Sequence, residues 1–232
     1  MERNAFLGDF VLTNFDNIPK EYFTEFQNFI IKERISSIIN LESPAIEKGM
    51  IKVKDKIVLN CSKEDIVFLK TFNPYLINLS NNHINDYGND SVQLTIKALK
   101  DNHLEFFGVG YDQEREKRVF FKDERTKTIY ISYCSRSSDF TRNKLFAEKD
   151  FIGSWEESID EIAYLKKENS NYFIIVNIHW GIENIKYPET EKCLLARKII
   201  DAGSDLIIGH HPHIIQPFEI YKGKWVIKFL LS

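Results

Sequence analysis

The sequence predicts a layered α/β fold. Short apolar runs of strand length alternate with longer segments whose apolar residues recur at helical spacing, which is typical of βα units. Residues 172–208 in particular form a strand–helix–strand pattern with Gly203 as the helix C-cap. The chain has 232 residues, 43% of them hydrophobic, with 10 glycines and 6 prolines, which is enough for one large domain with a full core.

The first half of the chain contains four predicted strands and three predicted helices. The strands are expected at residues 5–7, 36–41, 75–79 and 104–107, and the helices at residues 21–32, just after Ser62, and at residues 90–100. Residues 21–32 carry five apolar side chains at helical spacing, so this face is expected to cover the sheet. Ser62 and Asp65 are spaced as in a capping box, which predicts a helix start. Gly8 and Asp9 are expected in the loop that ends the first strand.

The second half contains two predicted hairpins and the strand–helix–strand unit. The strands are expected at residues 119–122, 128–133, 172–178, 205–208 and 225–231, and the helices at residues 155–167 and 189–202. No repeat or linker is present, so we expect a single domain over residues 1–232. The chain ends in an apolar strand, which favours a C-terminally truncated domain; a terminal strand docked in the sheet is the alternative.

Composition argues against several classes of protein. The net charge is -3, with 31 basic and 34 acidic residues interspersed, so no nucleic-acid partner is expected. Cys61, Cys134 and Cys193 are widely separated, which predicts small core residues and neither disulfides nor a thiolate zinc site. The sequence shows no signal-like run and no apolar run of membrane-spanning length, which predicts a cytoplasmic protein without a membrane span.

Polar residues of metal-binding type recur at the ends of the predicted strands. They are Asp9, Glu42, Asn81, Asn82, His83, His179, His210, His211 and His213. Each alone is as consistent with a cap, a turn or a buried core histidine, but five of the six histidines have such positions. Carboxylate, carboxamide and imidazole ligands together suit zinc, manganese or iron. The pattern therefore favours a divalent metal site.

Five motifs, in this order, resemble the CapA family of bacterial poly-gamma-glutamate capsule biosynthesis proteins, which are similar to calcineurin-like metallophosphoesterases. The motifs are Gly8-Asp9, Asn40-Leu41-Glu42-Ser43-Pro44, Asn81-Asn82-His83 with Asp86-Tyr87-Gly88, His179-Trp180-Gly181 with Glu183 and Pro188, and Gly209-His210-His211-Pro212-His213 with Gln216. The resemblance implies a metallophosphoesterase-like four-layer α/β/β/α sandwich with a metal site at one end of its central sheets.

The resemblance also implies a set of site residues. The implied metal ligands are Asp9, Glu42, Asn82, His179, His211 and His213, which would hold one or two divalent ions of Mn, Zn or Fe. Glu42 takes the place of the carboxylate that bridges two ions, and His83 is the implied catalytic residue near the reacting phosphate. His210 is left as an extra neighbour. Asp86 or Glu183 is expected to orient a ligating imidazole.

The implied function is metal-dependent, phosphoesterase-like hydrolysis in the biosynthesis of poly-gamma-glutamate or a related bacterial cell-surface polymer. The expected partners are a phosphoester or polyglutamate-like substrate and a capsule synthase. Family members are often membrane-anchored or exported, which is the alternative to a cytoplasmic location.

The chain departs from this pattern in two places. Val11 stands where phosphoesterases have a histidine, and the chain ends at Ser232 where the family continues into a Ser-Leu-Gly-Asn-Phe-like segment. Loss of a ligand favours the alternative function, a non-catalytic scaffold of a capsule-synthesis complex that binds polymer or synthase. A structural zinc module is less favoured, because such sites prefer cysteines.

Overall fold

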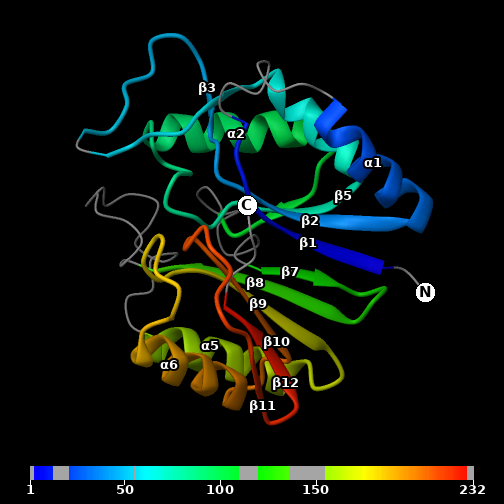
Figure 1. Ribbon diagram of the computed structural model, residues 1–232, viewed down its shortest axis with the longest axis vertical. Coiled ribbons are helices and arrows are strands. Elements are labelled where there is room, and N and C mark those ends of the chain that lie inside the picture. Colours follow the sequence, from blue (N-terminus) through cyan, green and yellow to red (C-terminus); the bar gives the residue numbers. More distant parts are fainter. Residues whose placement is uncertain (1–2, 13–20, 55, 110–119, 136–154, 229–232) are drawn as a thin grey trace. The chain divides into compact units, whose positions relative to one another are not determined.

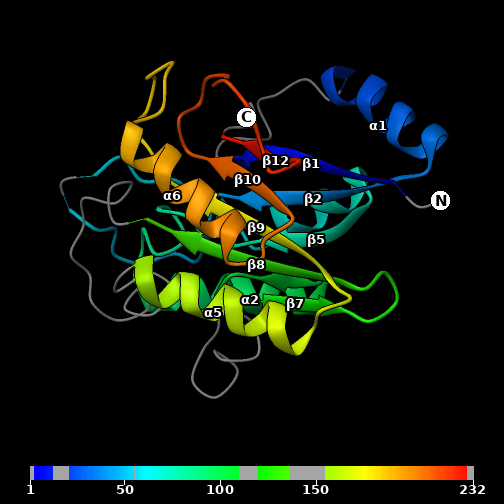
Figure 2. The ribbon, with the colours of Figure 1, turned by 90° about the horizontal axis from the view of Figure 1, so that it is seen from below.

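The computed structural model describes residues 3–12, 21–54, 56–109, 120–135 and 155–228. The chain divides into two compact units, Met1–Phe106 and Phe107–Ser232. Each unit has a main β-sheet with two α-helices on one of its faces (Figure 1 and Figure 2). The predicted α/β class is confirmed, and these sheets and helix layers agree with a metallophosphoesterase-like fold. The extent of the domain, predicted as residues 1–232, stays a prediction.

The first unit is built on a four-stranded sheet of order β1-β2-β5-β6, in which β1, β2 and β5 run parallel. Its elements are β1 (Arg3–Phe10), α1 (Glu21–Glu33), β2 (Ile35–Leu41), β3 (Ala45–Ile46), β4 (Cys61–Ser62), the 3₁₀ helix η2 (Asp65–Phe72), β5 (Pro74–Asn78), α2 (Asn89–Asp101) and β6 (Phe106–Phe107). All the predicted elements of this half are present. The short pair β3 and β4 was not predicted.

Strand β1 is longer than its apolar run. Gly8 and Asp9 lie within the strand and not in the predicted loop, because the ladder continues past a register irregularity between Phe6 and Asp9. Asp9 is paired with Asn40 of β2, and its side chain is only 4% exposed. A β-bulge of this kind keeps the strand going while it re-aims the side chains. The bulge therefore places Asp9 at the carboxyl end of β1.

The predicted capping box lies at the start of η2. The Ser62 amide donates to Asp65 Oδ2 at 2.8 Å, and the Asp65 amide donates to Ser62 Oγ at 3.2 Å. The helix that follows is a 3₁₀ helix, and its Phe72 packs edge-on against Phe10 at a centroid distance of 5.0 Å. The reciprocal bonds of the predicted capping box are therefore present, but they close the turn before the helix, whose N-cap residue is Glu64 and has no side-chain cap bond.

Helix α1 buries only part of its predicted apolar face. Ile30 is fully buried, whereas Phe29 is 53% exposed and Phe26 is 38% exposed. The expectation that this whole face covers the sheet is therefore wrong. Helical periodicity identifies the stripe but not its width, because the neighbouring surface decides how many residues of the stripe are covered.

The second unit is built on a six-stranded sheet of order β11-β12-β10-β9-β8-β7. Its elements are β7 (Phe120–Asp123), β8 (Thr128–Cys134), α5 (Trp155–Glu168), β9 (Phe173–His179), α6 (Thr190–Asp201), β10 (Leu206–His210), β11 (Glu219–Tyr221) and β12 (Lys224–Ile227). Both predicted hairpins are antiparallel pairs, and β8, β9, β10 and β12 run parallel. The end of the strand predicted at residues 225–231 lies outside the described residues.

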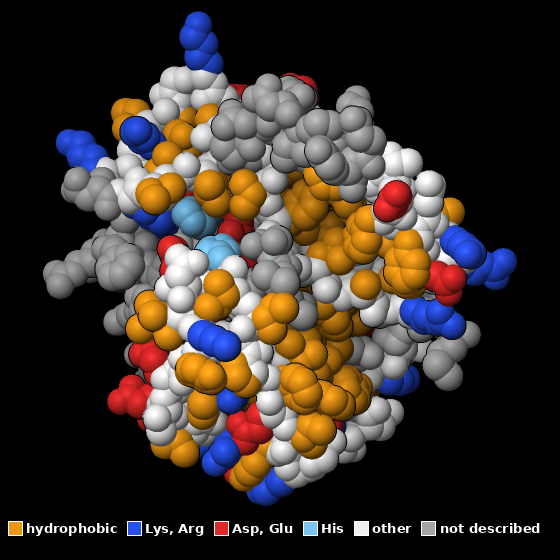
Figure 3. All heavy atoms as spheres, in the orientation of Figure 1, with side chains coloured by type: hydrophobic (Ala, Val, Ile, Leu, Met, Phe, Trp, Pro, Cys, Tyr) orange, Lys and Arg blue, Asp and Glu red, His pale blue; other side chains and the backbone are white. Residues whose placement is uncertain are grey.

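Charge and cysteine placement are ordinary for a globular protein. On the face shown in Figure 3, Lys and Arg side chains are dispersed among acidic, apolar and uncharged ones. The three cysteines are free, with Cys61 and Cys134 buried and Cys193 partly so. Burial, with a smaller effect of the nearby Asp65, raises the pKa of the Cys61 thiol to about 12. Among the described residues, no helix is long and apolar enough to cross a membrane.

The Asp205 carboxylate connects three elements of the second unit. Its carboxylate accepts from Lys166 Nζ at 2.9 Å and from the Ile174 amide at 3.0 Å, and it pairs with Lys224 Nζ at 2.8 Å. These partners belong to α5, β9 and β12. Burial raises the pKa of Asp205, but the bonds from Lys224, Ile174 and Lys166 outweigh this effect and lower the pKa below 3.8.

We expect Asp205→Asn to lower the free energy of unfolding by about 1–2 kcal/mol at pH 7, because it removes charge-assisted bonds at a partly exposed site. The pKa is lower in the folded state, so the stabilisation is present above about pH 4 and is lost as the pH falls through the lowered pKa. Urea unfolding of both proteins between pH 7 and pH 2.5 measures this. A gap that stays constant with pH, or an equal loss in the exposed control Asp160→Asn, would contradict the assignment.

Candidate metal centre

The carboxyl ends of the parallel strands in the first unit collect buried acidic and amide side chains. Asp9 lies near the end of β1, Glu42 follows β2, and Asn82 follows β5. Their exposed fractions are 4%, 1% and 4%. A carboxylate oxygen of Asp9 and one of Glu42 lie within 4.8 Å of each other. Two buried carboxylates this close repel each other unless a cation or a proton is shared between them, so the pair fits a divalent ion.

A network of asparagines positions this edge of the sheet. Asn40 Nδ2 donates to Asp9 Oδ1 at 2.7 Å, and Asn40 Oδ1 accepts from Asn78 Nδ2 at 3.0 Å. Asn81 Oδ1 accepts from the His83 amide at 3.1 Å. Asn40 and Asn78 are not among the site residues predicted from the sequence. A signal was present, since an asparagine inside an apolar strand needs a hydrogen-bond partner when it is buried.

The side chain of Asn82 fits a metal ligand. Its Oδ1 is inaccessible to solvent and accepts no hydrogen bond from any residue that the structure describes. A buried amide oxygen in this situation is costly unless something else binds it. The carboxylate, amide and imidazole donors present in the chain suit Mn, Zn or Fe, so the residues fit the predicted type of ion.

His83 is held by a buried carboxylate. Asp86, which is fully buried, lies 2.7 Å from His83 Nδ1 and accepts from the Leu59 amide at 2.7 Å. The Lys56 ammonium lies 2.9 Å from Asp86 Oδ1 and also donates to the Asn82 carbonyl. Because an ionised carboxylate only accepts, the contact places a hydrogen on Nδ1 of the imidazole. Asp86 therefore orients His83, an implied catalytic residue rather than one of the implied ligands.

The histidines of the second unit lie at the carboxyl ends of adjacent parallel strands. His179 of β9 and His210 of β10 are register partners, as the strand–helix–strand pattern predicted. His211 follows, with its ring centroid 4.9 Å from that of His179 and 5.9 Å from that of His213. His179 and His211 are buried, and His213 is half-buried. Three of the implied ligands are thus neighbours.

The loop that carries these histidines has an unusual backbone. His211 has φ 98° and His213 has φ 56°, values in the left-handed region that non-glycine residues rarely adopt. Such strain persists where the surrounding structure fixes it, and it is most common at functional sites. Glu183 lies near this loop, and one ligand atom from each of Glu183, His211 and His213 lies within 4.8 Å of the others.

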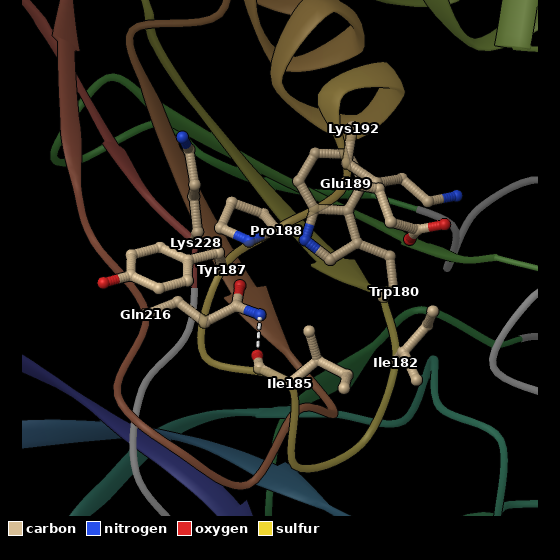
Figure 4. Close-up of a pocket in the computed structure, with 10 residues that line it drawn as sticks. Trp180, Ile182, Ile185, Tyr187, Pro188, Glu189, Lys192, Gln216 and Lys228 are labelled. Carbon is tan, nitrogen blue, oxygen red and sulfur yellow. Dashed lines mark hydrogen bonds between the residues drawn. The ribbon is translucent and has the colours of Figure 1, made fainter.

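A small, mainly apolar pocket lies beside this loop, lined by Trp180, Ile182, Ile185, Pro188 and Gln216 among others (Figure 4). Gln216 Nε2 donates to the Ile185 carbonyl at 2.8 Å. This bond joins the segment after β9 to the segment after β10. The pocket thus forms where the two histidine-bearing loops meet.

Within each unit, the structure therefore brings the predicted site residues to one edge of a sheet. Asp9, Glu42, Asn82 and His83 gather in the first unit, and His179, His211 and His213 gather in the second. Their roles as ligands or catalyst stay predictions. The fold is that of a metallophosphoesterase-like protein.

Comparison with known proteins specifies the family. The sequence matches the family described as "Bacterial capsule synthesis protein PGA_cap" over residues 5–227, so the chain belongs to this family. It is 30% identical over 192 residues to "Capsule biosynthesis protein CapA" of Bacillus anthracis, covering 79% of this chain and 46% of that protein. It is 32% identical over 190 residues to "PGA biosynthesis protein CapA" of Bacillus subtilis, covering 79% and 49%.

A further relative is a "probable polyglutamine synthesis accessory protein" of Mycobacterium tuberculosis, which is 28% identical over 203 residues, covering 82% of this chain and 53% of the relative. The chain therefore spans about half the length of the curated relatives it matches. The predicted resemblance to the CapA family is confirmed.

We expect Gly209→Ala to destabilise the second unit by about 2–3 kcal/mol, the cost of overpacking. A Cβ at position 209 would lie 1.9 Å from the Lys228 carbonyl oxygen, a backbone atom that cannot move aside cheaply. Thermal and urea unfolding measure the effect. Wild-type stability in this variant would show that β10 and the segment after β12 are not packed as described.

We expect Asp86→Asn to abolish the preference of His83 for a hydrogen on Nδ1 and to lower stability by about 1–3 kcal/mol, because Lys56 and the Leu59 amide lose an ionised partner. Imidazole ¹⁵N NMR reports the tautomer, and urea unfolding reports the stability. The exposed Asp90→Asn is the matched control. An unchanged His83 spectrum would contradict the orienting role of Asp86.

Proposed function

We propose that the chain is a metal-dependent hydrolase of the phosphoesterase type that acts in the synthesis of poly-gamma-glutamate or a related bacterial cell-surface polymer. The observation that carries the hydrolase proposal is the buried pair Asp9 and Glu42, with carboxylate oxygens within 4.8 Å. The polymer is proposed because the relatives are named for capsule, PGA and polyglutamine synthesis. Since one relative is named an accessory protein, a polymer synthase is the proposed partner.

The proposed metal ligands are the six residues that the family resemblance implies. Asp9, Glu42 and Asn82 would supply oxygen, and His179, His211 and His213 would supply nitrogen, to one or two ions of Mn, Zn or Fe. Glu42 is the proposed bridging carboxylate when two ions bind. This assignment is supported by the burial of the two carboxylates, by the Asn82 oxygen that accepts no hydrogen bond from the described residues, and by the match to the family over residues 5–227.

His83 is the proposed catalytic residue. When bound, the cation supplies an activated water and stabilises the negative charge that develops on the substrate. Asp86 contacts Nδ1 of His83, so the other ring nitrogen, Nε2, is the one that would exchange a proton with the leaving oxygen. Lys56 lies 2.9 Å from Asp86 Oδ1 and so helps to hold Asp86 in place.

A non-catalytic scaffold is the second candidate function. The observation that favours it is Val11, which is 36% exposed and offers no donor where phosphoesterases have a histidine. A chain that binds metal but turns over no substrate would then hold polymer or synthase in place.

The cytoplasmic location expected from the sequence stays a prediction.

We expect the purified chain to contain divalent metal and to hydrolyse bis(p-nitrophenyl) phosphate with Mn²⁺, to lose this activity when a chelator removes the metal, and to regain it when Mn²⁺ is added back. Elemental analysis and release of p-nitrophenol measure the two properties. Bound metal without turnover across a panel of phosphomonoesters, phosphodiesters and glutamyl peptides would refute the hydrolase and support the scaffold.

We expect His211→Ala to lower metal occupancy at least about 10-fold, because it removes a proposed ligand. His103→Asn is the matched control, since His103 is exposed and Asn accepts its positive φ of 58°. Elemental analysis after dialysis against metal-free buffer makes the comparison. Unchanged metal content in His211→Ala would refute the ligand role.

A further inference from the structure

We propose that Glu183 is itself a metal ligand and completes a two-histidine, one-carboxylate site with His211 and His213. This inference rests on the proposed metal dependence and adds a ligand to it. One potential ligand atom of each residue lies within 4.8 Å of those of the other two, and all three residues belong to the second unit. Two imidazoles and one carboxylate with open positions form a ligand set that suits catalytic zinc and non-haem iron.

The backbone next to Glu183 is hydrogen-bonded to the loop that carries His211 and His213. The amide of Asn184, the next residue, donates to the carbonyl of Pro212 at 2.9 Å, and Pro212 lies between the two histidines in sequence. On the other side, Gly181 lies near the Pro212 ring, since a Cβ at position 181 would be in ordinary van der Waals contact with Pro212 Cγ at 3.4 Å. The position of Glu183 relative to the histidines is therefore restrained by the main-chain bond of Asn184 and by the nearness of Gly181 to the Pro212 ring.

Local conformation supports the same placement. Gly181 has φ 92°, Asn184 has φ 61°, and His211 has φ 98°, so both segments turn sharply at the points where they meet. A non-glycine residue such as His211 keeps a left-handed conformation only where its surroundings fix it. Shared coordination of one ion by Glu183, His211 and His213 would supply such a constraint.

Among the residues that the structure describes, none competes for the Glu183 carboxylate. Within the described part of the chain it makes no hydrogen bond or ion pair, whereas Glu219 of the same unit pairs with Arg197 at 2.7 Å. Glu183 also adds an oxygen donor to a set that lacks the histidine replaced by Val11. A carboxylate is a harder ligand than an imidazole. A carboxylate at this position therefore favours Mn²⁺ and Fe²⁺ more than an imidazole would.

The test is binding of Co²⁺ to the whole chain. Binding is monitored by visible absorbance, because the absorption band of bound Co²⁺ depends on its coordination. We expect Glu183→Gln to bind Co²⁺ at least about 10-fold more weakly than the wild type and to change the band, since loss of even an outer-shell partner weakens metal sites by about 10–100-fold. Glu191→Gln, at an exposed position of α6, is the matched control and should bind like the wild type. Melting of the metal-free proteins checks that each variant folds, and Glu183→Ala is measured in parallel.

The outcomes separate this inference from the proposed function. If Glu183→Gln and Glu183→Ala bind Co²⁺ like the wild type while His211→Ala does not, the Glu183 assignment is overturned and the metal dependence stands. If His211→Ala also binds like the wild type, both proposals fail. Weakened binding in the Glu183 variants, with an unchanged Glu191→Gln control, establishes Glu183 as part of the site.

Discussion

Parallel strand register is the constraint on which the candidate metal centre depends. When neighbouring strands run in the same direction, the residues that follow them meet at one edge of the sheet. In the second unit this register sets His179 beside His210 and so delivers His211 to the same edge. In the first unit it sets Asp9 beside Asn40, with Glu42 two residues further along. Neither set of donors would gather if one of these strands were reversed, because its polar end would lie at the opposite edge.

The hydrogen bonds around this edge restrict the donors further. Asn40 donates to one oxygen of Asp9, and Asp86 contacts one nitrogen of His83, so at least one atom of each of these side chains is fixed in direction. Such supporting hydrogen bonds are common at metal and catalytic sites, where they orient the reactive group. Several of the buried polar residues at this edge, Asn40, Asn78 and Asn81 among them, bond to one another and so hold their side chains in fixed directions.

Much of the fold could be predicted from the sequence, since alternation of apolar runs and helical stripes depends on local pattern. The end of β1 could not, because Asp9 stays in the strand through a bulge and a bond from Asn40, which is distant in sequence. The exposure of Phe29 depends on what surrounds α1. In the site, the motifs predicted the donors, but Asp86 contacts His83, the implied catalytic residue, and not a ligating imidazole as predicted. Glu183 lies close to His211 and His213 because two loops meet there, and the spacing of these residues in the sequence does not show this.

The bonds to Asp86 have a consequence for motion. Its carboxylate accepts from the Leu59 amide and contacts the Lys56 ammonium, and its own carbonyl accepts from the Val53 amide at 2.8 Å. The segment before β4 is thus joined at three points to the residue that orients His83. Opening of this segment would have to break bonds to Asp86, so local unfolding there and release of the imidazole would be one cooperative event. The segment before β4 therefore restrains the orientation of the His83 imidazole through Asp86.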